Sequence, residues 1–104
     1  MEEEIFRPNG RSYIYILANT KYGLTYIGMT GDLIGKIYSH RKDVSRKISN
    51  RYKIHNLVYY ETAKDMTEAL KRKKCLKNLS RKEKMELIDA KNPEWQDLYY
   101  KIIL

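Results

Sequence analysis

Residues 12–40 read SYIYILANTKYGLTYIGMTGDLIGKIYSH. This stretch decides the fold, because its pattern predicts two short strands joined by a turn and followed by a helix. The segments Tyr13-Ile14-Tyr15 and Tyr26-Ile27-Gly28 are rich in aromatic and β-branched residues, which suit a pleated, half-buried surface. Between them, Lys21-Tyr22-Gly23 offers a turn in which the glycine can take a positive φ.

The hairpin and the helix predict a common location for four polar side chains. Because side chains alternate along a strand, pairing of the two strands can bring Tyr15 and Tyr26 onto one face. The helix that begins near Asp32 then projects Lys36 and His40 from a single stripe, one turn apart. Each candidate also has a plain structural explanation. The phenols can be packing residues with one polar end, and His40 can be a core histidine with satisfied hydrogen bonds.

The rest of the chain predicts one more strand and three more helices. Leu57–Glu61 (LVYYE) reads as the strand, and capping signatures open helices at Asp65 and Ser80, each with a glutamate three residues later. Asn92 followed by proline predicts a last helix, on which apolar residues including Trp95 recur at helical spacing. The predicted fold is therefore α+β, with a small three-stranded antiparallel sheet flanked by helices.

Length and composition predict a single small domain. The chain has 104 residues, 42% hydrophobic and 33% charged, which is typical of a soluble globular protein with one core. The sequence predicts that residues 1–11 form a mobile leader and that residues 12–104 form the domain. The single cysteine, Cys75, excludes a disulfide framework and a cysteine zinc site and fits a reducing interior. We therefore expect a cytoplasmic protein, without signal peptide or membrane-spanning helix.

Basic residues outnumber acidic ones, with 21 Lys and Arg against 13 Asp and Glu and a net charge of +8. Such a charge favours polyanionic partners, and nucleic acid first among them. Basic residues are most frequent in residues 41–53, and a tyrosine lies among them. Such a segment can form a surface that follows the phosphates of a nucleic acid, but a solvated run of charges fits the pattern equally well. The candidate nucleic-acid-binding residues there are Arg41, Lys42, Arg46, Lys47, Arg51 and Lys53.

These residues together resemble a known family. A tyrosine ending the first strand, a Tyr-Ile-Gly motif that begins eleven positions later at Tyr26, and a helix with a basic residue and a histidine resemble the GIY-YIG nuclease superfamily. The resemblance spans about residues 12–100 and is strongest to small single-domain bacterial members, although Tyr13 stands where the family's first motif begins with glycine. It implies the fold of a DNA endonuclease related to the incising subunit of nucleotide excision repair, and hence a link to DNA repair.

The resemblance also implies roles for individual residues. In working members, two tyrosines, an arginine and a glutamate surround one divalent metal ion. Tyr15 and Tyr26 match the tyrosines and His40 matches a family histidine, but Lys36 stands at the arginine position and Lys73 at the metal-binding glutamate. Lysine keeps a positive charge but loses the planar fork of arginine, and an ammonium cannot ligate Mg²⁺.

The pattern around Lys73 leaves two readings open. Residues at helical spacing predict that it lies on an inward stripe, which comprises Ala69, Leu70, Lys73, Leu76 and Lys77. Its ammonium can therefore reach back to water along the helix, or it can enter the position of the family's metal ion. Cys75 on the same helix is predicted to be a buried small hydrophobe.

We therefore predict a domain that binds nucleic acid, in particular DNA, with impaired or lost cleavage of phosphodiester bonds and no cofactor. One alternative is an active nuclease that uses Mg²⁺ or Mn²⁺, held by a displaced carboxylate such as Glu61 or Glu68. The other is a protein-interaction module that keeps the fold for packing only.

Overall fold

The computed structural model describes residues 11–42 and 53–103. Its elements are β1 (Ser12–Ala18), β2 (Thr25–Thr30), α2 (Leu33–Lys42), β3 (Asn56–Ala63), α4 (Met66–Lys77), α5 (Arg81–Lys91) and α6 (Tyr99–Ile102). The strands form one antiparallel sheet in the order β2-β1-β3, which confirms the predicted α+β fold. Of the predicted leader, only Arg11 lies within the described residues. None of the helices in these ranges has the length and apolar character needed to cross a lipid bilayer.

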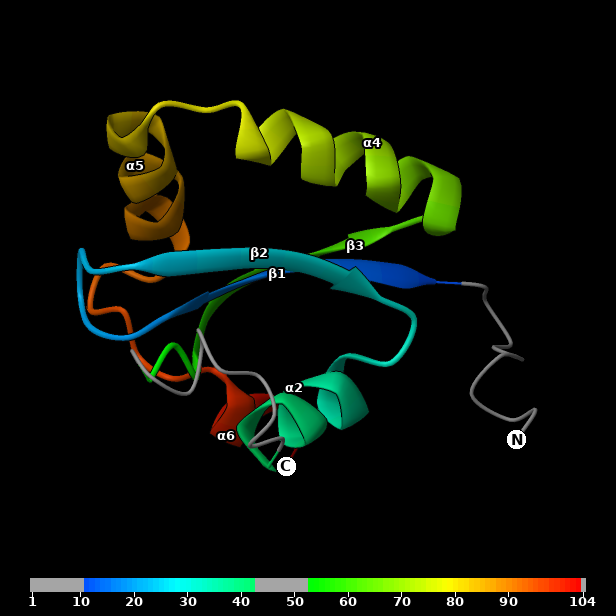
Figure 1. The fold of residues 1–104 in the computed structure, drawn as a ribbon, viewed down its shortest axis with the longest axis horizontal. Helices are drawn as coiled ribbons and strands as arrows, with labels where there is room; N and C mark the ends of the chain where they lie inside the picture. The colour runs from blue at the N-terminus through cyan, green and yellow to red at the C-terminus, as the bar shows by residue number, and fades with distance from the viewer. Residues whose placement is uncertain (1–10, 43–52, 104) are drawn as a thin grey trace.

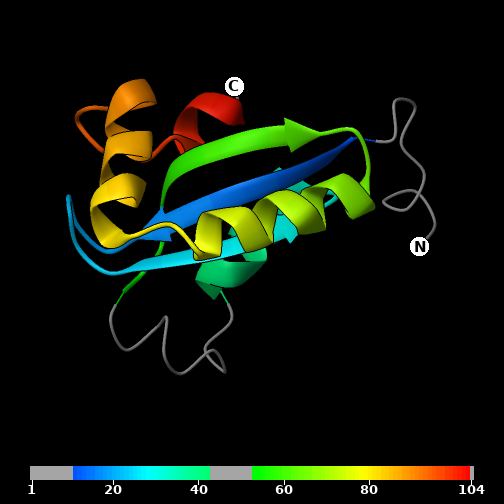
Figure 2. The same cartoon turned by 90° about the horizontal axis from the view of Figure 1, so that it is seen from above.

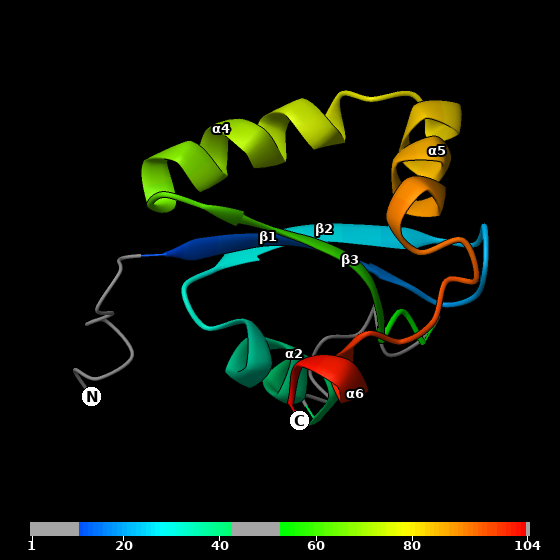
Figure 3. The same ribbon diagram turned by 180° about the vertical axis from the view of Figure 1, so that it is seen from behind.

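Helices cover both faces of the sheet. Figure 1 shows α4 and α5 on one side and α2 and α6 on the other, and the reverse view in Figure 3 agrees. Seen from above, α4 runs along the sheet (Figure 2). The central strand β1 contributes side chains to a hydrophobic core on each face of the sheet. Ile14 and Ile16 lie in the core under α4 and α5, whereas Tyr15 and Leu17 lie in the core with α2. Residues of the first hairpin therefore stand between two hydrophobic layers.

The turn between β1 and β2 differs from the prediction in its backbone. Tyr22, and not Gly23, takes the left-handed conformation, with a φ of 59°. The side chain of Asn19 organises the turn by accepting hydrogen bonds from the N–H groups of Thr20 and Leu24, both at 2.8 Å. A Cβ on Gly23 would overlap the Asn19 amide, so glycine is needed there for space rather than for a positive φ.

Helix capping follows the sequence closely. Asp65 accepts a hydrogen bond from the N–H of Glu68 at 3.0 Å, and Ser80 and Glu83 form a complete capping box at the start of α5. At the start of α2, Asp32 accepts a hydrogen bond from the N–H of Gly35 at 3.1 Å. A Cβ on Gly35 would overlap the Asp32 carboxylate, which explains a glycine inside this helix.

The prediction that a helix begins at Asn92 was wrong. Asn92 ends α5, where its N–H donates to the carbonyl of Ile88 at 2.8 Å, and α6 covers only Tyr99–Ile102. The Asn92 amide donates to the carbonyl of Val58 at 2.9 Å, so it fastens the end of α5 to β3 instead of opening a helix. Trp95 is buried as predicted, but its φ of 52° interrupts any helix there.

The inward stripe of α4 is narrower than predicted. Ala69 and Leu76 are buried, but Leu70 is 41% exposed. Cys75 is exposed, so the prediction of a buried cysteine was wrong. Leu70 is exposed because Arg72 turns toward the sheet and reaches Glu61 on β3, which rotates the contact face away from Leu70. Cys75 lies about 120° from Ala69 around the helix, on the side that faces away from the sheet.

Candidate functional site

The first motif tyrosine lies opposite the motif glycine. Tyr15 and Gly28 are Cα partners in the β1–β2 ladder, and Tyr15 is only 1% exposed. A Cβ on Gly28 would overlap the phenol of Tyr15, so the ring crosses β2 at the one position without a side chain. The strand pairing therefore carries the Tyr15 phenol toward the free edge of the sheet, since β2 is an edge strand.

Tyr26 and His40 complete a cluster of rings on the α2 side of the sheet. The ring centroids of Tyr15 and Tyr26 are 6.4 Å apart, and those of Tyr26 and His40 are 5.5 Å apart. Tyr26 is 40% exposed, whereas His40 is 1% exposed. The hairpin and the helix thus bring together three of the predicted site residues, with one phenol at the surface and the other rings behind it.

A second histidine extends this cluster. The ring centroids of His55 and His40 are 6.1 Å apart with the rings nearly perpendicular. Burial lowers the pKa of His55, and the positive charges of Arg41 and Lys53 lower it further. The sequence carries no signal for this residue, because His55 precedes β3 and meets His40 only through the tertiary fold.

Lys36 lies one helical turn before His40, beside a shallow cavity. The cavity has a volume of about 240 Å³ and is lined by Thr30, Asp32, Gly35, Lys36 and Ser39. Lys36 is half-buried, and among the described residues its ammonium has no ion-pair or hydrogen-bond partner. The cavity therefore combines the ammonium of Lys36 and the hydroxyl groups of Thr30 and Ser39, which can donate to a phosphate oxygen, with the carboxylate of Asp32, which accepts the N–H of Gly35.

Lys73 approaches from the other layer. It is half-buried on α4, between the buried residues Ala69 and Leu76 along the helix. Successive residues of a helix are about 100° apart, so Arg72 and Lys73 lie on opposite sides of the surface of α4 that faces the sheet. Arg72 reaches β3, so Lys73 is turned to the β2 side of α4. The structure brings Tyr15, Tyr26 and His40 together on the α2 side of the sheet and places Lys36 on the same helix as His40, whereas Lys73 lies on α4, which covers the opposite face (Figure 1).

Comparison with known proteins now identifies the family. Residues 11–86 match the model of the GIY-YIG catalytic domain. The chain belongs to the GIY-YIG family. It is 32% identical over 81 residues to the UPF0213 protein CPE1444 of Clostridium perfringens, covering 78% of this chain and 86% of that protein. It is 35% identical over 78 residues to the UPF0213 protein SSP2268 of Staphylococcus saprophyticus, covering 75% and 94%. No solved structure is significantly similar to this chain.

The carboxylate nearest to α4 in this GIY-YIG domain is fully engaged. Glu61 accepts two hydrogen bonds from the guanidinium of Arg72, both at 2.9 Å, and a third from the hydroxyl of Tyr59. Burial acts to raise the pKa of Glu61, but these hydrogen bonds outweigh it and leave that pKa lowered. Burial, together with the bond to Glu61, raises the pKa of Tyr59 to about 12. The network joins β3 to α4 as a stable, ionised unit.

This donor set does not fit the divalent metal ion implied by the GIY-YIG fold. The ammonium of Lys73 cannot bind a divalent metal ion, and both oxygens of Glu61 are already bound. Glu68 lies 3.7 Å from the ammonium of Lys71 on the exposed side of α4. Of the two candidates for a displaced carboxylate, Glu61 is therefore bound by Arg72 and Glu68 lies on the exposed side of α4.

The basic run contributes unequally to this surface. The guanidinium of Arg41 donates to both oxygens of Asp97, at 2.8 and 2.7 Å, and lies 4.5 Å from the ring centroid of Tyr99. Lys42 and Lys53 are exposed. Arg46, Lys47 and Arg51 lie outside the described residues. Arg41 thus fastens α2 to the C-terminal segment, and Lys42 and Lys53 are accessible cations among the described residues of the run.

Proposed function

We propose that this GIY-YIG domain binds DNA along the β2 edge and that its cleavage of phosphodiester bonds is impaired or lost. The observation that carries the proposal is the presence of two half-buried lysines, Lys36 on α2 and Lys73 on α4. They stand where family resemblance expects an arginine and a metal-binding glutamate. Both keep the affinity for phosphate, and neither supplies the chemistry of the residue it replaces.

Charge and exposure support the binding part of the proposal. Domains of the GIY-YIG family generally bind nucleic acid, and this chain has a net charge of +8. Tyr26 is 40% exposed, and exposed aromatic rings on a basic protein are suitable for contact with bases. Salt-sensitive binding is therefore expected, because each contact with a phosphate releases counterions.

Magnitudes support impaired cleavage. Loss of one preorganised electrostatic stabiliser lowers a rate by roughly 10²- to 10³-fold, and loss of a metal ligand adds to this. Two ammonium groups near one phosphate also repel a divalent cation, whereas a carboxylate would attract it. Because Arg72 binds both oxygens of Glu61, Glu61 is not available to bind a metal ion in place of the family's glutamate.

Binding is tested by fluorescence anisotropy with duplex DNA over a range of salt concentrations. We expect an affinity that falls steeply as salt rises, and a smaller slope for the double variant Lys36→Gln/Lys73→Gln. The matched control is Lys82→Gln/Lys84→Gln on α5, away from the β2 edge. A wild-type protein without affinity for DNA would favour the protein-interaction module instead.

Cleavage is tested with the double variant Lys36→Arg/Lys73→Glu. We expect no Mg²⁺-dependent nicking of plasmid DNA by the wild type and a gain of nicking in this variant. The control Lys36→Arg/Lys74→Glu has the same charge change but places the carboxylate on an exposed neighbouring position. Nicking by the wild type that disappears in Glu61→Gln would overturn the proposal and identify an active enzyme with a displaced carboxylate.

A further inference from the structure

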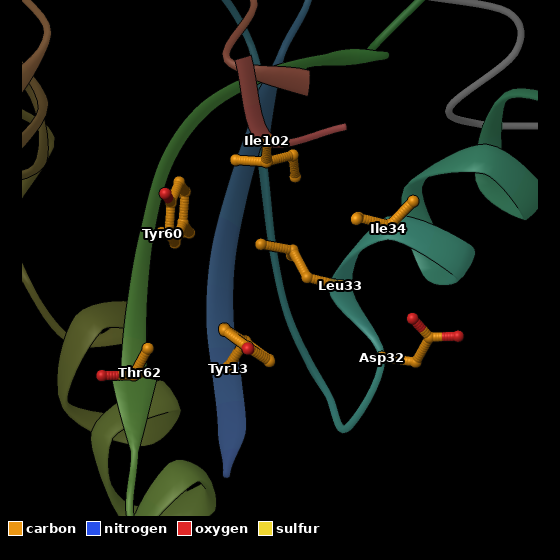
Figure 4. A pocket seen from close by; sticks show the side chains of 7 residues that line it. All are labelled: Tyr13, Asp32, Leu33, Ile34, Tyr60, Thr62 and Ile102. Carbon is orange, nitrogen blue, oxygen red and sulfur yellow. The ribbon is translucent and has the colours of Figure 1, made fainter. Parts of the chain in front are cut away.

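A second cavity lies on the same face of the sheet as the ring cluster, between α2, α6 and the strands β1 and β3. Its volume is about 340 Å³, within the range of about 300–1,000 Å³ that small-molecule pockets occupy. Figure 4 shows it as an opening between the start of α2 and the two strands, with α6 at one end. None of the predicted site residues lines it, so it is separate from the ring cluster.

The cavity is lined by aromatic and aliphatic side chains together with two polar residues, Asp32 and Thr62. Two phenol rings from neighbouring strands and three aliphatic side chains from two helices face it, namely Tyr13, Tyr60, Leu33, Ile34 and Ile102 (Figure 4). Ile34 at the mouth is 43% exposed, so the cavity is accessible from solvent. A flat apolar ring suits such walls, because stacking on aromatic side chains is favourable for every base.

The cavity borders the site of Lys36 directly. Asp32 lines both cavities, and its carboxylate is directed toward the first turn of α2, where it accepts the N–H of Gly35 (Figure 4). The side chain of Asp32 therefore lies between the two cavities and does not fill the second one. A ligand that joins a flat ring to an anionic group can place the ring among the phenols and the anion beside Lys36.

We propose that the apolar cavity holds one unstacked nucleobase whose adjoining phosphate lies at Lys36, a proposal that rests on the nucleic-acid function above. The charge of the surroundings favours this occupant over an apolar side chain of a protein partner. The Lys36 ammonium and the net charge of +8 attract an anion, which a nucleotide carries next to its ring. The domain therefore binds best where a base is unpaired, as in single strands or at a duplex distortion.

The proposal is tested on the full chain by methyl NMR, with adenosine 5′-monophosphate as the probe. We expect saturable shifts of the methyl signals of Leu33, Ile34 and Ile102. Ribose 5-phosphate, which lacks the base, should leave these methyl signals in place. The absence of methyl shifts with the nucleotide would overturn the proposal. Methyl shifts that follow protein concentration instead would also overturn it, because they would show a second copy of the chain in the cavity.

Two tryptophan variants provide a matched pair. Ile34 and Ile103 are each 43% exposed, but only Ile34 lines the cavity. We expect Ile34→Trp to fill the mouth and weaken nucleotide binding about tenfold, the scale of one stacked base, and Ile103→Trp to have no effect. Equal effects of both variants would contradict the proposal. If Ile34→Trp does not fold, the nucleotide titration of the wild-type protein still tests the proposal.

Duplex DNA measured in parallel separates this proposal from the proposed function. Salt-sensitive binding of duplex DNA without methyl shifts by the nucleotide would overturn the base pocket and leave the proposed function standing. Methyl shifts by the nucleotide without binding of any duplex or single-stranded DNA would overturn the proposed function. We expect both signals, with tighter binding of a duplex that contains one unpaired base than of a fully paired duplex.

Discussion

The phenol of Tyr15 occupies the space that a Cβ on Gly28 would need. The two residues face each other across β1 and β2, so the Tyr-Ile-Gly motif has its glycine where the buried ring passes. This contact fixes the ring within 6.4 Å of Tyr26. A packing constraint on one glycine therefore sets the geometry of the whole cluster.

Gly28→Ala should destabilise the domain. The added methyl group meets the Tyr15 ring in a packed layer, and overpacking of this kind costs about 1–3 kcal/mol. Urea denaturation of the wild type and the variant measures the difference. The control is Gly31→Ala, since a Cβ on Gly31 has no atom within 4 Å. In a Tyr15→Leu background the cost of Gly28→Ala should shrink, and an unchanged cost would refute the contact.

Arg41→Met should lower stability and leave the affinity for DNA unchanged. Arg41 donates to Asp97, which also accepts the N–H of Leu57 at 3.1 Å, so its removal leaves a partly buried carboxylate with fewer donors. Loss of hydrogen bonds to a charged group costs about 1.5–3 kcal/mol. Denaturation and anisotropy with duplex DNA measure the two effects. Lys42→Met is expected to show the opposite pattern, weaker binding at unchanged stability.

Glu61→Gln should flatten the loss of stability in acid. The pKa of Glu61 is lowered in the folded state, so its contribution is present above the unfolded value of 4.5 and is lost as pH falls through the folded pKa. The free energy of unfolding, measured from pH 7 to pH 3, should therefore fall more steeply in the wild type than in the variant. Parallel curves would mean that the bond to Arg72 does not favour the ionised carboxylate.

His55 should titrate below its ordinary pKa of 6.5. The folded state then binds fewer protons than the unfolded state just below pH 6.5, so stability falls as pH decreases through this range. An NMR titration of the imidazole signal gives the pKa directly. Removing a neighbouring charge with Lys53→Gln should raise it, whereas Lys101→Gln, remote in sequence, should not. A pKa at or above 6.5 in the wild type would contradict the burial of this ring.

Local patterns in the sequence predicted the features that depend on near neighbours. Strand alternation predicted that Tyr15 and Tyr26 share a face, and both capping signatures at Asp65 and Ser80 are confirmed. These features could be predicted because alternation and capping each involve residues a few positions apart, whose geometry hardly depends on the rest of the chain.

The predictions that failed depend on distant partners. Leu70, predicted to face inward, is exposed because Arg72 turns α4 toward Glu61, eleven residues before Arg72 in the chain. Asn92 does not open a helix, since its amide bonds to Val58, thirty-four residues earlier. Both residues fit their local patterns, but a polar side chain with a buried long-range partner gains more from that bond than from the local alternative.

The sequence by itself determined the three strands, the starts of α2, α4 and α5, the basic charge and the family to which the chain belongs. Only the tertiary structure decided that His55 joins the ring cluster, that Arg41 is bound to Asp97, and that a cavity opens beside Lys36. The physical reason is that backbone propensities act between near neighbours, whereas burial, ion pairing and cavities arise only when separate segments pack against each other.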